Sequence, residues 1–137
     1  MMKIRGQDSW GHGAYNAPRD GGKRKHKGAD YVNHFGEAVA AFEGGEVTKI
    51  GFPYSQKSAK KRHFRLVELR ITPAIVHRYF YVESFVQPGE MVAKGQIIGW
   101  AQDLDKVYPG IVQHVHFEIK KNGRFINPAE YLENVVI

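Results

Sequence analysis

The chain contains no cysteine among its 137 residues. Disulfide bonds and thiolate ligands are therefore excluded, so a zinc site here would have to use histidine and carboxylate side chains. No apolar run approaches the roughly 20 residues that a membrane-spanning helix needs. The first residues, Met1 to Asp8, also lack the apolar core of a signal peptide. We expect no membrane span, and export either without a signal peptide or after its removal.

Long helices are also disfavoured by the composition. The 15 glycines and 6 prolines favour short strands and turns. Hydrophobic residues make up 42% and charged residues 25%, as in an ordinary folded domain rather than a disordered chain. We predict a single domain over residues 1–137, mainly β, built as an antiparallel or barrel-like sheet with few or no long helices.

Alternating polarity predicts strands at residues 38–42, 46–50, 63–72 and 74–83, after a loop-rich segment over residues 1–31. In 74–83, strand alternation would put His77, Tyr79 and Tyr81 on one face, where polar groups could line a groove. Turns are predicted at Pro88-Gly89 and at Asn122-Gly123, and a short helical turn at residues 128–132.

Two histidines one residue apart, His114 and His116, lie in a strand-like run near the end of the chain. Strand alternation puts both rings on one face, while Val115 and Phe117 point into the core. The rings would stand about 7 Å apart along the strand, which is too far for easy ligation of one metal by both. The spacing instead suits one ring on a metal and the other beside a reacting water molecule. Alone, however, the His-x-His pattern arises often by chance.

A second cluster, His26-Lys27-Gly28-Ala29-Asp30, offers partners for this pair. With His116 it would supply two imidazoles and one carboxylate, leaving a fourth tetrahedral position open, as in catalytic zinc sites. Gly28 would let the backbone bend between the two ligands. Zinc would then activate water, and His114 would take its proton.

Tyr81 is a candidate donor to the developing oxyanion, although an ordinary half-buried strand aromatic explains the pattern equally well. His77 is a reserve polar group on the same face. Glu118 shares the histidine face and could orient a ring. Trp10, Tyr15 and Tyr108 could line a groove or pack in the core.

The formal net charge of +6 is concentrated in two basic clusters, at residues 23–27 and 57–65. Such clusters attract polyanions, including nucleic acid and anionic cell walls, but solvated loops explain them about as well. No stacking motif accompanies them. A nucleic-acid binder is therefore the weakest of the functions that we consider.

Taken in order, these motifs resemble the lysostaphin-type, LytM-like zinc endopeptidases that cut peptidoglycan cross-links. The matching segments are His26-x-x-x-Asp30, Pro88-Gly89, Lys94-Gly95-Gln96-Ile97-Ile98-Gly99, His114-x-His116, Asn122-Gly123 and Asn127–Leu132. The resemblance implies a β-rich fold of the duplicated hybrid motif type. It also implies zinc on His26, Asp30 and His116, with His114 as the catalytic base.

The chain departs from that pattern at one position. Active members usually carry a further histidine where this sequence has Tyr81, within Tyr79-Phe80-Tyr81. The segments 8–19 and 106–111 resemble the leukocyte cell-derived chemotaxin branch of the same fold. That branch also has tyrosine at this position, keeps the zinc site and is regarded as non-peptidase. Its animal members carry disulfides, so the absence of cysteine favours a bacterial or phage protein.

Two functions are suggested by this resemblance. The first is a zinc endopeptidase that hydrolyses peptide cross-links of peptidoglycan, acting outside the cytoplasm on the cell wall as a virion component or lysis protein. The second is a binding module of the same fold with zinc and no turnover. The oligomeric state and the bond that is cut are left open by the sequence.

Overall fold

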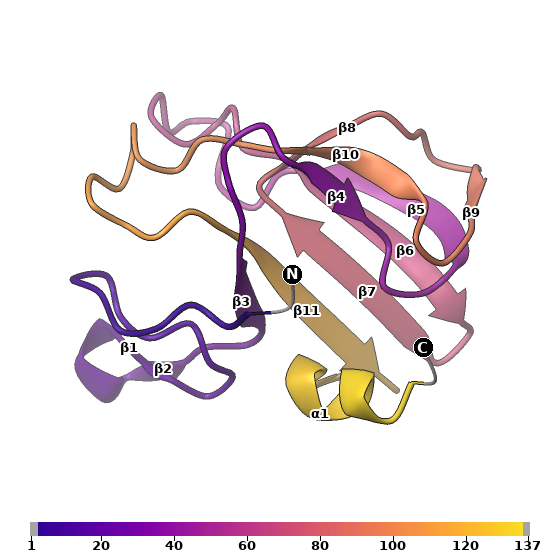
Figure 1. The fold of residues 1–137 in the computed structure, drawn as a ribbon, viewed down its shortest axis with the longest axis horizontal. Coiled ribbons are helices and arrows are strands. Elements are labelled where there is room, and N and C mark those ends of the chain that lie inside the picture. Colours follow the sequence, from indigo (N-terminus) through magenta and orange to yellow (C-terminus); the bar gives the residue numbers. More distant parts are fainter. Residues whose placement is uncertain (1–2, 136–137) are drawn as a thin grey trace.

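Antiparallel strands account for most of the regular structure in the computed structural model, which describes residues 3–135 (Figure 1). The strands are β1 (Pro18–Arg19), β2 (Arg24–Lys25), β3 (Ala29–Val32), β4 (Ala38–Ala40), β5 (Gly45–Gly51), β6 (Leu66–Thr72), β7 (Ile75–Phe80), β8 (Val82–Ser84), β9 (Met91–Val92), β10 (Ile97–Ala101), β11 (His114–Lys121) and β12 (Arg124–Ile126). A 3-10 turn, η1 (Asp20–Gly22), joins β1 to β2, and one short helix, α1 (Pro128–Glu133), lies near the C-terminus. The mainly-β prediction is confirmed.

The strands form two open sheets and a small hairpin. The large sheet has the order β12-β11-β7-β6-β5-β9, and β3 pairs with the first half of β11 beside β12. The smaller sheet has the order β4-β10-β8, and β1 pairs with β2. Every strand pairing is antiparallel. The sheets are thus open rather than closed into a barrel.

The hydrophobic core lies between the two sheets. Val39 on β4 and Ile98 on β10 belong to the same buried cluster as Leu69 on β6 and Phe117 on β11. Within β11, Val115, Phe117 and Ile119 all enter this core, as strand alternation predicts. The core therefore fixes which face of β11 is left for the histidines.

Tyr81 marks the point where the chain leaves the large sheet for the smaller one. Its φ of 71° is left-handed, which is unusual for a bulky residue, and it separates β7 from β8. This backbone conformation breaks the strand alternation, so the predicted common face of His77, Tyr79 and Tyr81 is wrong. His77 and Tyr79 pack against Phe117 in the core, whereas Tyr81 packs in a second buried cluster.

The predicted turns and helix are confirmed. Asn122 and Gly123, with φ of 52° and 78°, form the two-residue connection between β11 and β12. Gly89 has φ of 97° in a turn closed by a hydrogen bond from Glu90 N to Gln87 O. The helix α1 begins after Asn127, whose side chain accepts a hydrogen bond from Ala129 N at 3.0 Å.

The N-terminal segment covers the second face of β11. Arg5 N donates to Asp30 O at 2.8 Å, and Gly13 N donates to Arg5 O at 3.0 Å. His114, His116 and Glu118 on this face are buried, although they point away from the core. Within residues 3–135, no helix is long and apolar enough to cross a membrane.

Candidate metal centre

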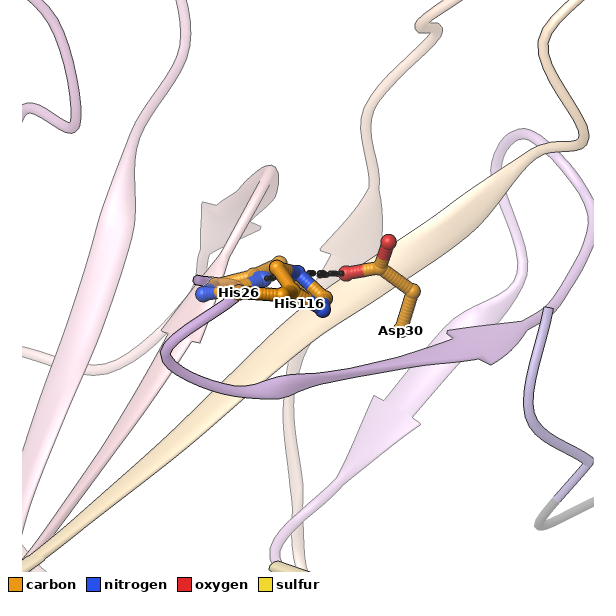
Figure 2. A group of neighbouring side chains, drawn as sticks. All are labelled: His26, Asp30 and His116. Atoms are coloured by element: carbon orange, nitrogen blue, oxygen red, sulfur yellow. Dashed lines mark hydrogen bonds and ion pairs between the residues drawn. The ribbon is translucent and has the colours of Figure 1, made fainter. Parts of the chain in front are cut away.

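Three potential ligand atoms lie together although they come from two distant segments of the chain, residues 26–30 and β11. His26 Nε2 lies 3.2 Å from Asp30 Oδ1, and His116 Nδ1 lies 2.9 Å from the same oxygen. The two ring nitrogens are 2.9 Å apart. Figure 2 shows the Asp30 carboxylate directed at the imidazole rings. Antiparallel pairing of β3 with β11, with His116 opposite Asp30, brings these residues together across more than eighty positions of sequence.

The far nitrogen of each ring fixes its tautomer. His26 Nδ1 lies 3.0 Å from the carbonyl oxygen of Ala14, and His116 Nε2 lies 2.9 Å from Glu118 Oε1. Both partners can only accept, so these nitrogens carry the protons. In the neutral rings, His26 Nε2 and His116 Nδ1 then direct lone pairs at each other and at Asp30 Oδ1. Three lone-pair donors in contact repel one another unless a cation lies between them. In the metal-free chain a proton on His116 Nδ1, donated to Asp30 Oδ1, fills this role, and a divalent metal ion would replace that proton, so the donor set fits such an ion.

The electrostatics of the centre favours positive charge. Burial alone would lower the pKa of His116, but its hydrogen bonds to Asp30 and Glu118 outweigh burial and raise the pKa to about 9. Burial would raise the pKa of Asp30, yet hydrogen bonds to His116 and His26 hold it well below its ordinary value. Asp30 is therefore ionised, as a metal ligand must be.

Arg5 holds the carboxylate of Asp30 in place. Its side chain is 2% exposed, and its Nε and Nη2 donate to Asp30 Oδ2 at 3.1 and 3.0 Å. Nη1 donates to Gly11 O at 2.8 Å and lies 2.8 Å from Asp8 Oδ1. Oδ2 is thus occupied, which leaves Oδ1 to meet the imidazoles. Arg5 could not be predicted from the sequence, because an isolated arginine in a loop-rich segment belongs to no recognisable pattern.

Gly28 is required for a different reason from the one predicted. A Cβ at this position would lie 2.4 Å from Phe117 O, 2.9 Å from His116 Cε1 and 3.0 Å from Glu118 Cγ. The loop that carries His26 therefore passes directly over β11. The role of Gly28 is this close approach of two backbones rather than a bend between ligands.

His114 lies beside the three converging atoms. Its Nδ1 donates to Val112 O at 2.7 Å, so Nε2 carries the lone pair, 3.5 Å from Asp30 Oδ2. Burial lowers the pKa of His114, although Asp30 and the Val112 carbonyl oppose this shift. The ring is therefore neutral near pH 7 and able to accept a proton.

Tyr81 faces the same space through a chain of phenol groups. Its ring lies 5.8 Å from the ring of His114. Tyr108 Oη donates to Tyr54 Oη at 2.8 Å, and Tyr54 Oη lies 2.8 Å from Tyr81 Oη. Because Tyr54 Oη accepts a hydrogen bond from Tyr108, the Tyr54 hydroxyl proton is available for donation to Tyr81 Oη. The Tyr81 hydroxyl could then donate its own proton to a group in the cleft. Burial raises the pKa of Tyr81 well above its usual value, which keeps this donor protonated.

These groups line one cleft of about 470 Å³. Of the aromatic residues considered from sequence, Trp10 and Tyr108 line it, whereas Tyr15 donates to Phe125 O elsewhere. His77 lies in the core and does not line it. Glu118 orients His116, as predicted. Tyr54 was missed, since nothing in its local sequence points to the cleft.

The arrangement combines a candidate metal centre, a neutral imidazole and a phenol donor around one open space. Such a set can activate water and stabilise negative charge on a polarised carbonyl oxygen, which is the chemistry of metal-assisted hydrolysis.

Comparison with known proteins agrees with this geometry. Residues 24–128 match the model of Peptidase family M23. The chain is 34% identical over 130 residues to leukocyte cell-derived chemotaxin-2 of Mus musculus, covering 95% of this chain and 80% of that protein.

Solved structures share this fold. Csd3 of Helicobacter pylori superposes with a TM-score of 0.65 at 24% identity, over 96% of this chain and 33% of that one. Lysostaphin of Staphylococcus simulans superposes with a TM-score of 0.69 at 20% identity, over 96% of this chain and 54% of that one. The chain thus spans about a third to a half of these structures. With a family match that covers well over half of its length, the chain belongs to peptidase family M23.

Proposed function

We propose that the protein is a zinc-dependent endopeptidase that hydrolyses peptide cross-links of bacterial peptidoglycan. The observation that carries this proposal is the convergence of two imidazole nitrogens and one carboxylate oxygen in an open cleft. Membership of peptidase family M23 and the fold shared with lysostaphin support the substrate class. We infer that it acts at the cell wall, as part of a virion or a lysis system.

His26 Nε2, Asp30 Oδ1 and His116 Nδ1 would hold the ion. Zinc at this position would supply Lewis-acid polarisation of the scissile carbonyl and lower the pKa of a water molecule. His114 Nε2 takes the proton from the attacking water, because its lone pair faces the cleft. Tyr81 Oη donates a hydrogen bond to the oxygen on which negative charge develops.

The test is the release of new amino termini from purified peptidoglycan sacculi by zinc-loaded protein. We expect His114→Ala to reduce the rate by about 10² to 10⁴, the usual contribution of a general base. The matched control is His63→Ala, which removes an exposed imidazole that does not line the cleft. If wild type and His114→Ala are equally inert while both hold zinc, the endopeptidase proposal fails.

A zinc-containing binding module without turnover is the second candidate, and Tyr81 is the observation that favours it. Its hydroxyl is already engaged with Tyr54, and a relative at 34% identity is named a chemotaxin rather than a peptidase. Tyr81→His separates the two candidates. Activity that appears in Tyr81→His but is absent from wild type would favour the binding module.

A further inference from the structure

The cleft carries more positive charge than its own acidic groups neutralise. Its lining contains six basic side chains, Arg5, Arg19, Arg24, Lys25, Lys27 and Lys61, and three acidic ones, Asp20, Asp30 and Glu118. Each acidic group already has a basic partner in the wall: Asp20 with Arg24, Asp30 with Arg5, and Glu118 with His116. Of the basic side chains left over, Lys27 holds its ammonium over the ring of Phe125, outside the lining, whereas Arg19 and Lys61 have contacts with the walls of the cleft itself.

Arg19 is the surplus cation beside the metal centre. Its side chain is 18% exposed, and its Nη2 lies 3.9 Å from Asp30 Oδ2, too far for a hydrogen bond. Arg5 already donates twice to that oxygen. Among residues 3–135, the Arg19 guanidinium makes one hydrogen bond, from Nη1 to the carbonyl of its neighbour Pro18 at 3.1 Å. Most of its five N–H donors are thus available within the cleft.

Lys61 adds a second charge on the tyrosine wall. Its Nζ lies 4.8 Å from the ring centroid of Tyr54 and 5.3 Å from that of Tyr108. These cation–π contacts hold the ammonium over the same rings whose hydroxyls connect to Tyr81. Within the described part of the chain, Lys61 has no carboxylate at ion-pair distance.

We propose that Arg19 is a carboxylate-binding residue of the cleft, with Lys61 contributing a second charge, and that the preferred ligand is a peptide with a free carboxylate near the metal centre. A guanidinium with a free fork of donors matches a carboxylate in two parallel hydrogen bonds. Asp30 Oδ2 does not supply these two hydrogen bonds to Arg19, because Arg5 already donates to it twice and Arg19 Nη2 lies 3.9 Å away. That the ligand is a peptide rests on the proposed function. That the peptide carries a free carboxylate rests on Arg19 and Lys61.

The experiment measures binding and cleavage separately. Two synthetic peptides of identical sequence are prepared, one with a glutamate α-carboxylate and one with the corresponding carboxamide. Titration calorimetry with the zinc-loaded full chain gives the dissociation constant of each, and amine release reports cleavage. We expect the carboxylate peptide to bind about tenfold more tightly, as a partly screened charge-assisted pair should.

Arg19→Gln should bring the two dissociation constants to within about twofold of each other, and Arg19→Lys should keep part of the preference because it keeps the charge but loses the fork. Arg124→Gln is the matched control, since Arg124 is exposed on β12 away from the cleft. Thermal unfolding of each variant shows whether Arg19→Gln remains folded.

Equal binding of the two peptides by wild type would overturn the inference, as would a preference that survives Arg19→Gln, or the absence of binding at millimolar peptide. A carboxylate preference without any cleavage would support the subsite while refuting the endopeptidase proposal. Cleavage without a carboxylate preference would support the endopeptidase proposal while refuting the carboxylate subsite.

Discussion

Gly28→Ala tests the close approach on which the metal centre is built. The added methyl would lie 2.4 Å from the carbonyl oxygen of Phe117, where about 3.3 Å is an ordinary carbon–oxygen contact. That oxygen belongs to the backbone of β11, so it cannot rotate away as a flexible side chain would. The second close contact, 2.9 Å, is with His116 Cε1, the carbon next to the ring nitrogen that faces Asp30.

The loop over β11 must therefore lift by most of an ångström, carrying His26 away from His116. Overpacking of this kind lowers the free energy of unfolding by about 2 kcal/mol. In a chain of this length that corresponds to a fall in Tm of roughly 8 °C. Because the strain falls on the ligands, zinc affinity should fall as well. Both quantities can be measured, by thermal unfolding with excess chelator and by zinc titration.

Gly6→Ala is the control, because a Cβ at Gly6 would meet no atom within 4 Å. It should change the free energy of unfolding by no more than about 0.5 kcal/mol. If Gly28→Ala matched Gly6→Ala in both stability and zinc affinity, the close packing of the His26 loop on β11 would be refuted.

Three further predictions concern buried or half-buried groups. His77, packed beside Glu43, Tyr79 and Tyr131, has a pKa lowered by burial to about 4. The unfolded chain, with an ordinary histidine pKa of about 6.5, binds this proton first. The free energy of unfolding should therefore fall by up to roughly 3 kcal/mol as the pH drops from 6.5 to 4. Urea unfolding across this pH range should show a much weaker pH dependence for His77→Leu than for wild type. Glu118→Gln should lower zinc affinity about 10- to 100-fold by weakening the hydrogen bond that orients His116, and a zinc titration unchanged from wild type would refute that role. Tyr54→Phe removes the hydroxyl that is hydrogen-bonded to Tyr81 Oη. It should lower kcat more than it raises KM, whereas a change in KM alone would contradict a role in orienting the donor.

Local patterns predicted the elements near the site well. The alternation in β11, the Asn122-Gly123 connection and the short helix after Asn127 depend on neighbouring residues, so the sequence carries them. The pairing of His26 and Asp30 with His116 was predicted from a conjunction of motifs. It required a contact between β3 and β11 that local patterns alone do not specify.

The predictions that failed depended on non-local or backbone information. Tyr81 lies on a different face from the one predicted, because its own left-handed backbone conformation interrupts the strand alternation. A prediction from periodicity assumes that the backbone is extended throughout. Arg5 and Tyr54 act through partners more than twenty residues away. Both residues line the cleft only because the folded chain brings the N-terminal segment and the loop over residues 53–65 together there.

Metal stoichiometry tests the central claim most directly. After zinc loading and exhaustive dialysis at neutral pH, wild type and His34→Ala, which alters an exposed imidazole, should each retain one zinc per chain by elemental analysis. His116→Ala and Asp30→Ala should retain far less while remaining folded by circular dichroism. Folded wild-type protein that retains no stoichiometric zinc, or a His116→Ala variant that retains as much as wild type, would contradict the account.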